Sequence, residues 1–208
     1  MGEYVKRRAY ISVFGYGQRN PQVVLIRNGW VDEWAVDVST AKQKGECIIP
    51  PTSEWSSPVD ECFLMVHKYI EEWIEYRQNE QEEYFGLGPI LVINITDGVV
   101  EDKTKTNEIA TKIMELQNTW LFNILIPEEV GVEIALPNNK YCLYRTRIDH
   151  ECRFYYDISS ALTLDENDVA RAECMGFEGA KSGGNIRGLI VSKNDKSASI
   201  ITEIMCHD

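Results

Sequence analysis

The sequence predicts an α/β fold in which a doubly wound, mostly parallel sheet carries helices on both faces. Three observations lead to this prediction. Residues 89–96 and 120–126 are nearly continuous apolar runs, typical of parallel strands covered on both faces. A helical apolar pattern lies between the runs, with Ile109, Ile113 and Leu116 on one face. Strand, helix and strand in that order indicate a crossover between parallel strands, the first of which we expect at the centre of the sheet.

The size and charge of the chain narrow its class. Its 208 residues suit one domain with a substantial core, and we expect a single domain over residues 1–208. A formal net charge of −12 argues against nucleic acid as a partner, because phosphate contacts need clustered Lys and Arg. No apolar run approaches the roughly 20 residues that span a bilayer, and residues 1–8 lack a signal-peptide pattern. We therefore expect a cytoplasmic protein with no membrane partner.

The sequence of the first third of the chain predicts three strands and one long helix. Residues 9–17 are aromatic and β-branched and end in glycines, as a strand does. Residues 22–27 and 34–38 are strand-like runs on either side of the turn signal Asn28-Gly29.

The long helix is expected from about residue 58 to about residue 80, with Ser57 as its N-cap and Pro58 at its first position. Its apolar side chains recur at helical spacing along one face: Val59, Cys62, Phe63, Val66, Ile70, Trp73 and Ile74.

The last third predicts shorter elements. Residues 151–160 and 166–175 have the pattern of short helices, residues 187–192 that of a strand, and residues 197–206 that of a terminal helix. Ser159 and Ser160 are not part of a nucleophile-elbow motif, so we expect them to have a capping or packing role.

The six cysteines leave two interpretations. Cys142, His150 and Cys152, with Cys206 and His207, could hold zinc, but their spacing matches no standard zinc pattern. Free thiols in a reducing compartment are the favoured interpretation.

Four stretches of the sequence resemble bacterial von Willebrand factor A-type domains in the order in which that family has them. They are the strand and loop of residues 89–98 (PILVINITDG), the strand of residues 11–17, the helix start at residues 56–59 (SSPV), and residues 154–160 followed by 187–191. The resemblance covers about residues 8–206. It implies a Rossmann-like domain with a metal-ion-dependent adhesion site at the carboxyl ends of its strands.

The resemblance also implies the ligands of that site. The family uses a D-x-S-x-S motif after its first strand, a Thr before a later helix, and an Asp after its fourth strand. Asp97 matches the last position, and Ser57 stands where the Thr is expected. Thr96 is the third candidate, with orientation of Asp97 as its simpler role. The cation would be Mg²⁺ or another divalent ion, completed by water and by an acidic side chain of a partner.

The D-x-S-x-S motif has no counterpart in this sequence. Only residues 1–8 precede the match to the second strand, so we expect the family's first strand to be missing. The chain would then be a fragment, or a subunit whose first strand comes from another chain in an oligomer or complex. Because two of the three ligand positions remain, we expect metal binding by this chain alone to be weak.

The favoured function is therefore a non-enzymatic protein-interaction module with a partial adhesion site. Such domains occur in bacterial stress-response and conflict systems, which the resemblance alone implies. Two alternatives remain open. One is a Mg²⁺-dependent phosphohydrolase or nuclease that uses Asp97 with Glu101 or Asp102. The other is a metal-free structural subunit.

Overall fold

The computed structural model describes residues 9–17, 23–47, 57–79, 88–129, 131–146, 148–163, 166–174, 186–193 and 201. The chain divides into two compact units, Met1–Tyr69 and Ile70–Asp208. The boundary between the units lies inside one long helix. Each unit is described by itself below.

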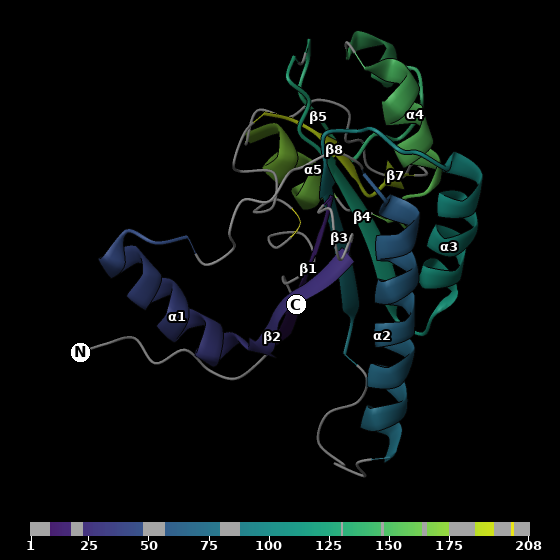
Figure 1. Ribbon diagram of the computed structural model, residues 1–208. Helices are drawn as coiled ribbons and strands as arrows, with labels where there is room; N and C mark the ends of the chain where they lie inside the picture. The colour runs from purple at the N-terminus through teal and green to yellow at the C-terminus, as the bar shows by residue number, and fades with distance from the viewer. Residues whose placement is uncertain are drawn as a thin grey trace. The chain divides into compact units, whose positions relative to one another are not determined.

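The first unit is built on an antiparallel hairpin. Strand β1 (Tyr10–Tyr16) pairs with β2 (Val23–Trp30), and the register shifts by one residue between Val13 and Phe14 (Figure 1). Helix α1 (Val31–Lys44) follows directly, and α2 (Val59–Asn79) begins in this unit. The Tyr69 side chain of α2 joins the hairpin, because its hydroxyl lies 3.0 Å from Ser12 Oγ and its ring packs edge-on against Phe14. The predicted strand at residues 9–17 and the long helix are thus confirmed.

The prediction of a turn at Asn28-Gly29 and of a strand at residues 34–38 is wrong. Strand β2 runs straight through both residues, and residues 34–38 lie in α1. Gly29 does not form a turn but leaves room for the Glu33 side chain, because a Cβ at this position would lie 2.8 Å from Glu33 Oε2. That carboxylate accepts the backbone N–H of Trp30 at 3.0 Å and so satisfies a donor at the start of α1.

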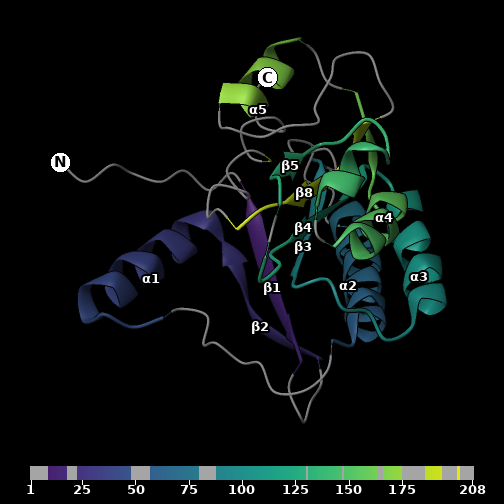
Figure 2. The same cartoon turned by 90° about the horizontal axis from the view of Figure 1, so that it is seen from above.

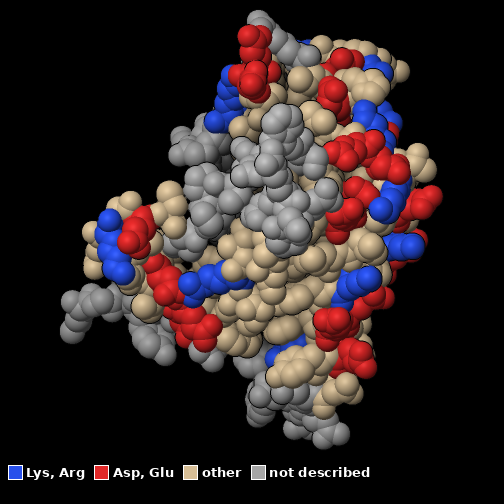
Figure 3. All heavy atoms as spheres, in the orientation of Figure 1, with Lys and Arg blue, Asp and Glu red and all other residues tan. Residues whose placement is uncertain are grey.

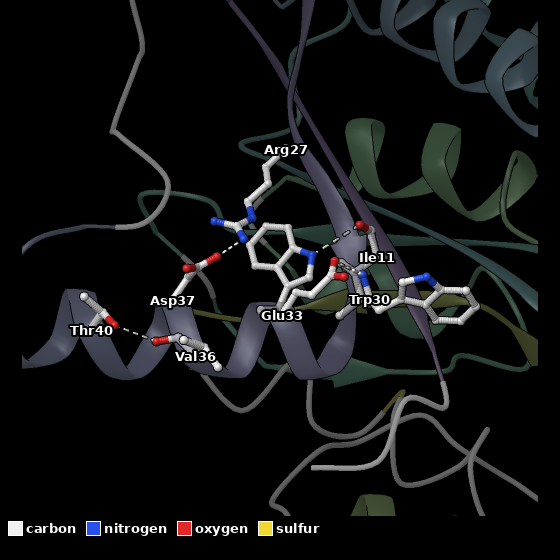
Figure 4. A network of polar contacts seen from close by, with 8 residues as sticks. Ile11, Arg27, Trp30, Glu33, Val36, Asp37 and Thr40 are labelled. Carbon is white, nitrogen blue, oxygen red and sulfur yellow. Dashed lines mark hydrogen bonds and ion pairs between the residues drawn. The ribbon is translucent and has the colours of Figure 1, made fainter. Parts of the chain in front are cut away.

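Polar contacts join helix α1 to the hairpin, and one of them is the ion pair between Arg27 and Asp37 (Figure 4). The indole N–H of Trp34 donates to the carbonyl of Ile11 at 3.3 Å, and Trp34 is 7% exposed. The guanidinium of Arg27 lies 4.8 Å from the centre of the Trp34 ring and forms an ion pair with Asp37. The helix therefore has a specific contact with both strands.

The second unit contains a four-stranded, mostly parallel sheet in the order β3-β4-β8-β5. Strands β3 (Ile90–Thr96), β4 (Thr119–Leu125) and β8 (Leu189–Val191) are parallel, and β5 (Ile134–Ala135) is antiparallel to β8. Helix α3 (Lys103–Glu115) connects β3 to β4. The predicted α/β class and the strand-helix-strand unit are confirmed.

Short elements complete the second unit. They are a 3₁₀ turn (Cys142–Arg145), α4 (Asp149–Asp157), α5 (Glu166–Cys174), and the pair β6 (Ala161–Leu162) and β7 (Ile186–Arg187). The helices predicted at residues 151–160 and 166–175 are thus confirmed. The terminal helix predicted at residues 197–206 lies outside the described residues apart from Ile201, which is helical and buried.

The two faces of this sheet have different coverings. Helices α3 and α4 pack against β4 and lie on the same side of it (Figures 1 and 2). Phe122 and Ile124 face away from Leu121 and Leu125 because side chains alternate along a strand. The buried cluster around Phe122 and Ile124 includes Ala135, Leu136, Leu162, Ile186, Ile190 and Ile201, with Val169 of α5 against it.

The prediction that β3 is a central strand covered on both faces is wrong for the described sheet. Strand β3 lies at one end of the strand order, and β4 lies between β3 and β8. Ile93 and Ile95 of β3 are 40% and 52% exposed, whereas residues 121–125 of β4 are all buried. Strand β4 is thus the buried central strand that the apolar pattern had indicated for β3.

Charged side chains are mixed over the visible surface. On the face shown in Figure 3, Lys and Arg lie interspersed among Asp and Glu and do not gather into one basic patch. Within the described part of the chain, no helix is both long and apolar enough to cross a membrane.

Candidate functional site

The carboxyl end of β3 carries two of the three predicted ligands. Asp97 follows the last residue of β3 and is exposed, and Thr96 beside it is 7% exposed. The backbone folds tightly here: the N–H of Gly98 donates to Thr96 Oγ1 at 3.2 Å, and that of Val99 donates to Asp97 Oδ1 at 3.3 Å. The second contact orients the Asp97 carboxylate at the end of the strand.

Gly98 allows this turn to form against α4. Its φ of +111° is a conformation that residues with a side chain rarely adopt. A Cβ at this position would also lie 3.4 Å from Leu125 and 3.5 Å from the Cβ of Glu151 in α4. The turn after β3 is therefore packed between β4 and α4.

Tyr155 of α4 brings a buried hydroxyl to the same place. The side chain is fully buried, and its hydroxyl has no hydrogen-bond partner among the described residues. Burial raises the pKa of Tyr155, and the negative charge of Asp97 adds to this increase. The nearby Thr96 side chain lowers the pKa by more than Asp97 raises it, but the two hydroxyls lack the geometry of a hydrogen bond. An unpartnered buried hydroxyl beside an exposed carboxylate is consistent with a site that takes a ligand.

A series of hydrogen bonds between buried polar groups links β3, β4 and the end of α4. Asn94 of β3 donates to the Asn123 side chain of β4 at 2.9 Å, and Asn123 donates to Ser159 Oγ at 2.9 Å. The Ser159 hydroxyl in turn donates to the carbonyl of Tyr155 at 2.6 Å. Because these bonds are buried, each fixes its partner strongly, and together they hold the end of α4 against β3 and β4.

The two serines that follow α4 have the packing role expected of them. Ser159 and Ser160 are both buried. The Oγ of Ser160 accepts the N–H of Leu121 at 2.8 Å, and its own N–H donates to the carbonyl of Leu121 at 2.9 Å. Both hydroxyls therefore serve to attach the segment to β4.

Ser57, the third predicted ligand, belongs to the first unit, whereas Asp97 and Thr96 belong to the second. It precedes α2, which begins at Val59, one residue later than expected and within the usual scatter of helix ends. The carbonyl of Pro58 accepts the N–H of Cys62 at 3.0 Å. A site shared by Ser57 and Asp97 stays a prediction.

The two carboxylates proposed to act with Asp97 in a phosphohydrolase, Asp102 and Glu101, have different surroundings. Asp102 caps α3, because its Oδ1 accepts the N–H of Lys105 at 2.9 Å. Glu101 is exposed in the preceding loop. The described residues contain no group of three or more His, Cys, Asp or Glu side chains that could hold a metal ion.

The alternative zinc ligands also have separate partners. The Cys142 thiol lies 3.0 Å from the carbonyl of Asn139, and His150 Nδ1 lies 3.0 Å from Lys103 Nζ. Cys152 is fully buried, which raises the pKa of its thiol to about 11. Cys142 and Cys152 are both free thiols, as favoured from the sequence, whereas Cys206 and His207 lie outside the described residues.

The donor set fits a divalent cation only in part. Mg²⁺ prefers six oxygen ligands in octahedral geometry. The described residues at the end of β3 offer one carboxylate, from Asp97, and the hydroxyls of Thr96 and Tyr155. The Thr96 oxygen already accepts one hydrogen bond. These oxygens could contribute to a cation site, but they do not complete one.

Asp97 and Thr96 were candidates from the sequence, whereas Tyr155, Asn94 and Asn123 were not. A signal for the two asparagines was present: each is the single polar side chain in the middle of an apolar run, and they are aligned across the two strands. Tyr155 had no such signal, because only the packing of α4 brings it near Asp97. No protein-family model matches the chain, and neither a curated protein nor a solved structure shows significant similarity to it.

Proposed function

We propose that this chain is a non-enzymatic interaction module of the von Willebrand A type, with a Rossmann-like sheet and a partial metal-ion-dependent adhesion site. One observation carries the proposal. An exposed carboxylate, Asp97, ends a parallel strand next to the buried Thr96, and it is near enough to the buried Tyr155 hydroxyl to raise the pKa of that group. The carboxyl edge of a parallel sheet is the usual place for a ligand in α/β proteins.

In this proposal the residues around Asp97 bind and orient, and they carry out no reaction. Asp97 supplies the charge, the N–H of Val99 fixes its orientation, and Tyr155 offers a donor that is already desolvated. A divalent cation, when bound, would supply a positive centre that accepts a carboxylate of a partner protein.

Among the described residues, no group of three or more His, Cys, Asp or Glu side chains could hold a metal ion, and this favours binding over catalysis. Metal-dependent hydrolysis usually needs several carboxylates to hold one or two ions and to activate water. Here the Asp102 carboxylate is used to cap α3. We therefore expect no phosphatase activity with a generic phosphate ester in the presence of Mg²⁺ that exceeds the activity of the Asp97→Ala variant.

The donor set also supports a role for a second molecule. The missing oxygens would come from a partner protein or from another chain in an oligomer or complex. The free thiols of the described residues, Cys47, Cys62, Cys142, Cys152 and Cys174, are consistent with a reducing compartment such as the cytoplasm.

Calorimetry with Mg²⁺ and Mn²⁺ tests the proposal. We expect weak binding, with a dissociation constant roughly in the millimolar range, because one carboxylate competes poorly with water for these ions. The Asp97→Ala variant should lose this binding, and the Glu115→Ala variant should keep it. Tight, stoichiometric binding by the wild-type chain, abolished in Asp97→Ala, would instead indicate a complete site with further ligands. Binding that is unchanged in Asp97→Ala would exclude Asp97 as a ligand.

A further inference from the structure

Three large aliphatic side chains close to Asp97 are exposed. Ile95, Val99 and Ile126 are 52%, 60% and 45% exposed, respectively, and we call these three residues the Asp97 rim. They lie close to the carboxylate along the backbone and across the sheet. The N–H of Val99 donates to Asp97 Oδ1, and the N–H of Ile126 donates to the carbonyl of Thr96 at 2.8 Å.

The alternation of side chains places part of the rim on the same face as Asp97. Ile95 and Asp97 are two residues apart on β3, and Ile126 is two residues beyond Ile124, which is the partner of Ile95 in the register of β3 and β4. Because side chains two residues apart share a face, the carboxylate is next to exposed aliphatic groups. An exposed group of large aliphatic side chains beside one charge is typical of an interaction surface.

The carboxylate at the centre of this surface is exposed. Asp97 forms no ion pair with any residue that the structure describes. Lys103, the next basic residue along the chain, is directed to α4, where its Nζ lies 3.0 Å from His150 Nδ1 and 5.6 Å from the centre of the Phe154 ring. The charge of Asp97 is therefore available to a partner.

We propose that the Asp97 rim binds a partner protein through a lysine or arginine side chain that is flanked by apolar residues. The inference rests on the interaction role in the proposed function, because it uses the same edge of the sheet, and it assigns a basic side chain of the partner in place of a metal-bound acidic one. One carboxylate is enough for an ammonium or guanidinium group, whereas it supplies only one of the ligands that Mg²⁺ requires.

Two physical effects favour this partner. Lysine and arginine have long aliphatic stems that can cover the rim while the charged end reaches Asp97. Covering the rim removes water from the carboxylate, which strengthens an ion pair. In addition, the net charge of −12 attracts basic partners from a distance and repels acidic ones.

A titration with three short peptides tests the inference. The probes are capped pentapeptides with glycine at both ends and the central sequences isoleucine-lysine-isoleucine, isoleucine-glutamate-isoleucine and glycine-lysine-glycine. Binding is followed by the amide resonances of the ¹⁵N-labelled full chain, in buffer with EDTA and in buffer with Mg²⁺. We expect the first peptide to shift the signals of Asp97, Val99 and Ile126 in both buffers, and to bind about fivefold more tightly than either other peptide.

Two variants and a control separate charge from apolar contact. Asp97→Asn should weaken binding of the isoleucine-lysine-isoleucine peptide about fivefold. This peptide should then bind no more tightly than the glutamate peptide. Val99→Ser should weaken binding of the isoleucine-lysine-isoleucine peptide but leave the affinity for the glycine-lysine-glycine peptide unchanged. Glu115→Gln removes the same charge at the end of α3, just before β4 begins, and should leave all three affinities within about twofold of wild type.

The outcomes distinguish this inference from the proposed function. Binding of the glutamate peptide that requires Mg²⁺ and Asp97 would overturn the inference and would support the metal-bridged form of the proposed function. If no peptide shifts the signals around Asp97, the inference is also overturned, and the calorimetric test of metal binding decides the proposed function separately.

Discussion

At the scale of single residues, the site depends on a contrast between satisfied and unsatisfied polar groups. The amide of Asn123 and the hydroxyl of Ser159 are buried and hydrogen-bonded to each other. The Tyr155 hydroxyl is equally buried but has no partner in the described structure. A buried polar group without a partner costs about 1–3 kcal/mol, so Tyr155 is kept at the expense of stability.

Tyr155→Phe should therefore stabilise the protein. Removing the hydroxyl removes its desolvation cost, and we expect the free energy of unfolding in urea to rise by about 1 kcal/mol. Tyr141→Phe is the matched control, because Tyr141 is 80% exposed and should show no change. A loss of 1 kcal/mol or more in Tyr155→Phe would show that the hydroxyl has a partner, such as a fixed water molecule, in the protein alone.

The buried cysteines give a prediction that depends on pH. Burial raises the pKa of the Cys62 thiol to about 12, and that of Cys152 to about 11. Because the folded pKa values exceed those of an unfolded chain, both groups favour the folded state fully below about pH 9. This contribution is lost as the pH rises toward 11 and 12.

The same pKa shifts protect these thiols from alkylation, since the thiolate is the reactive form. With N-ethylmaleimide at pH 8, the exposed Cys47 and Cys174 should be modified at least tenfold faster than Cys62 and Cys152. Mass spectrometry of the digested protein measures each rate. Equal rates at Cys47 and Cys62 would contradict the burial of α2's apolar face.

How far single residues could be predicted depends on whether their role is local. Asp97 was found because the apolar run that precedes it marks the end of a strand, which is a local pattern. Tyr155 could not be found, because its role arises from the packing of α4 against the turn after β3, 58 residues earlier in the chain.

At the scale of elements, α1 shows where local patterns mislead. Residues 34–38 are rich in valine and aromatic side chains, which favour a strand. Helix α1 forms nevertheless, because Asp32 and Glu33 lie in its first turn and Lys42 and Lys44 in its last, where each charge complements the helix dipole. Strand β2 continues through Asn28-Gly29, so the turn signal there was overridden by pairing with β1.

The end of α1 gives a prediction for this element. Gly45 has a φ of +68°, its N–H donates to the carbonyl of Lys42, and the N–H of Glu46 donates to that of Ala41. This is the hydrogen-bond pattern of a Schellman motif. A Cβ on Gly45 would meet nothing within 4 Å, so the cost of Gly45→Ala arises from the backbone conformation alone.

Gly45→Ala should lower the free energy of unfolding by about 1 kcal/mol. Gly88→Ala is the control, because that position also has open space around it but no positive φ. It should be neutral or slightly stabilising. Urea unfolding followed by tryptophan fluorescence measures both. Equal effects of the two substitutions would contradict the left-handed conformation at Gly45.

At the scale of the whole molecule, the fold class was predictable but the order of the strands was not. The apolar runs of β3 and β4 are almost equally continuous, so the sequence does not show which of them is central. That difference is decided by β8, which pairs with β4 from more than 60 residues away. The pairing of distant strands depends on the packing of the whole sheet, which local periodicity does not describe.

The division of the chain into two units also depends on contacts between residues that are distant in the sequence. Helix α2 has one continuous apolar pattern, which predicts a single element, and the structure confirms it. Which part of this helix belongs with which strands is set by contacts that are distant in the chain.

The central claim is that Asp97, at the carboxyl end of β3, is the ligand-binding position of this protein. The most direct test is the broadening of ¹⁵N amide signals by Mn²⁺, a paramagnetic ion that prefers oxygen ligands. At low Mn²⁺ concentration, we predict that the signals of residues 96–99 and of Ile126 broaden first, and that Asp97→Asn removes this effect while Glu115→Gln does not. Broadening that is centred elsewhere in the chain, or that is the same in Asp97→Asn, would contradict the claim.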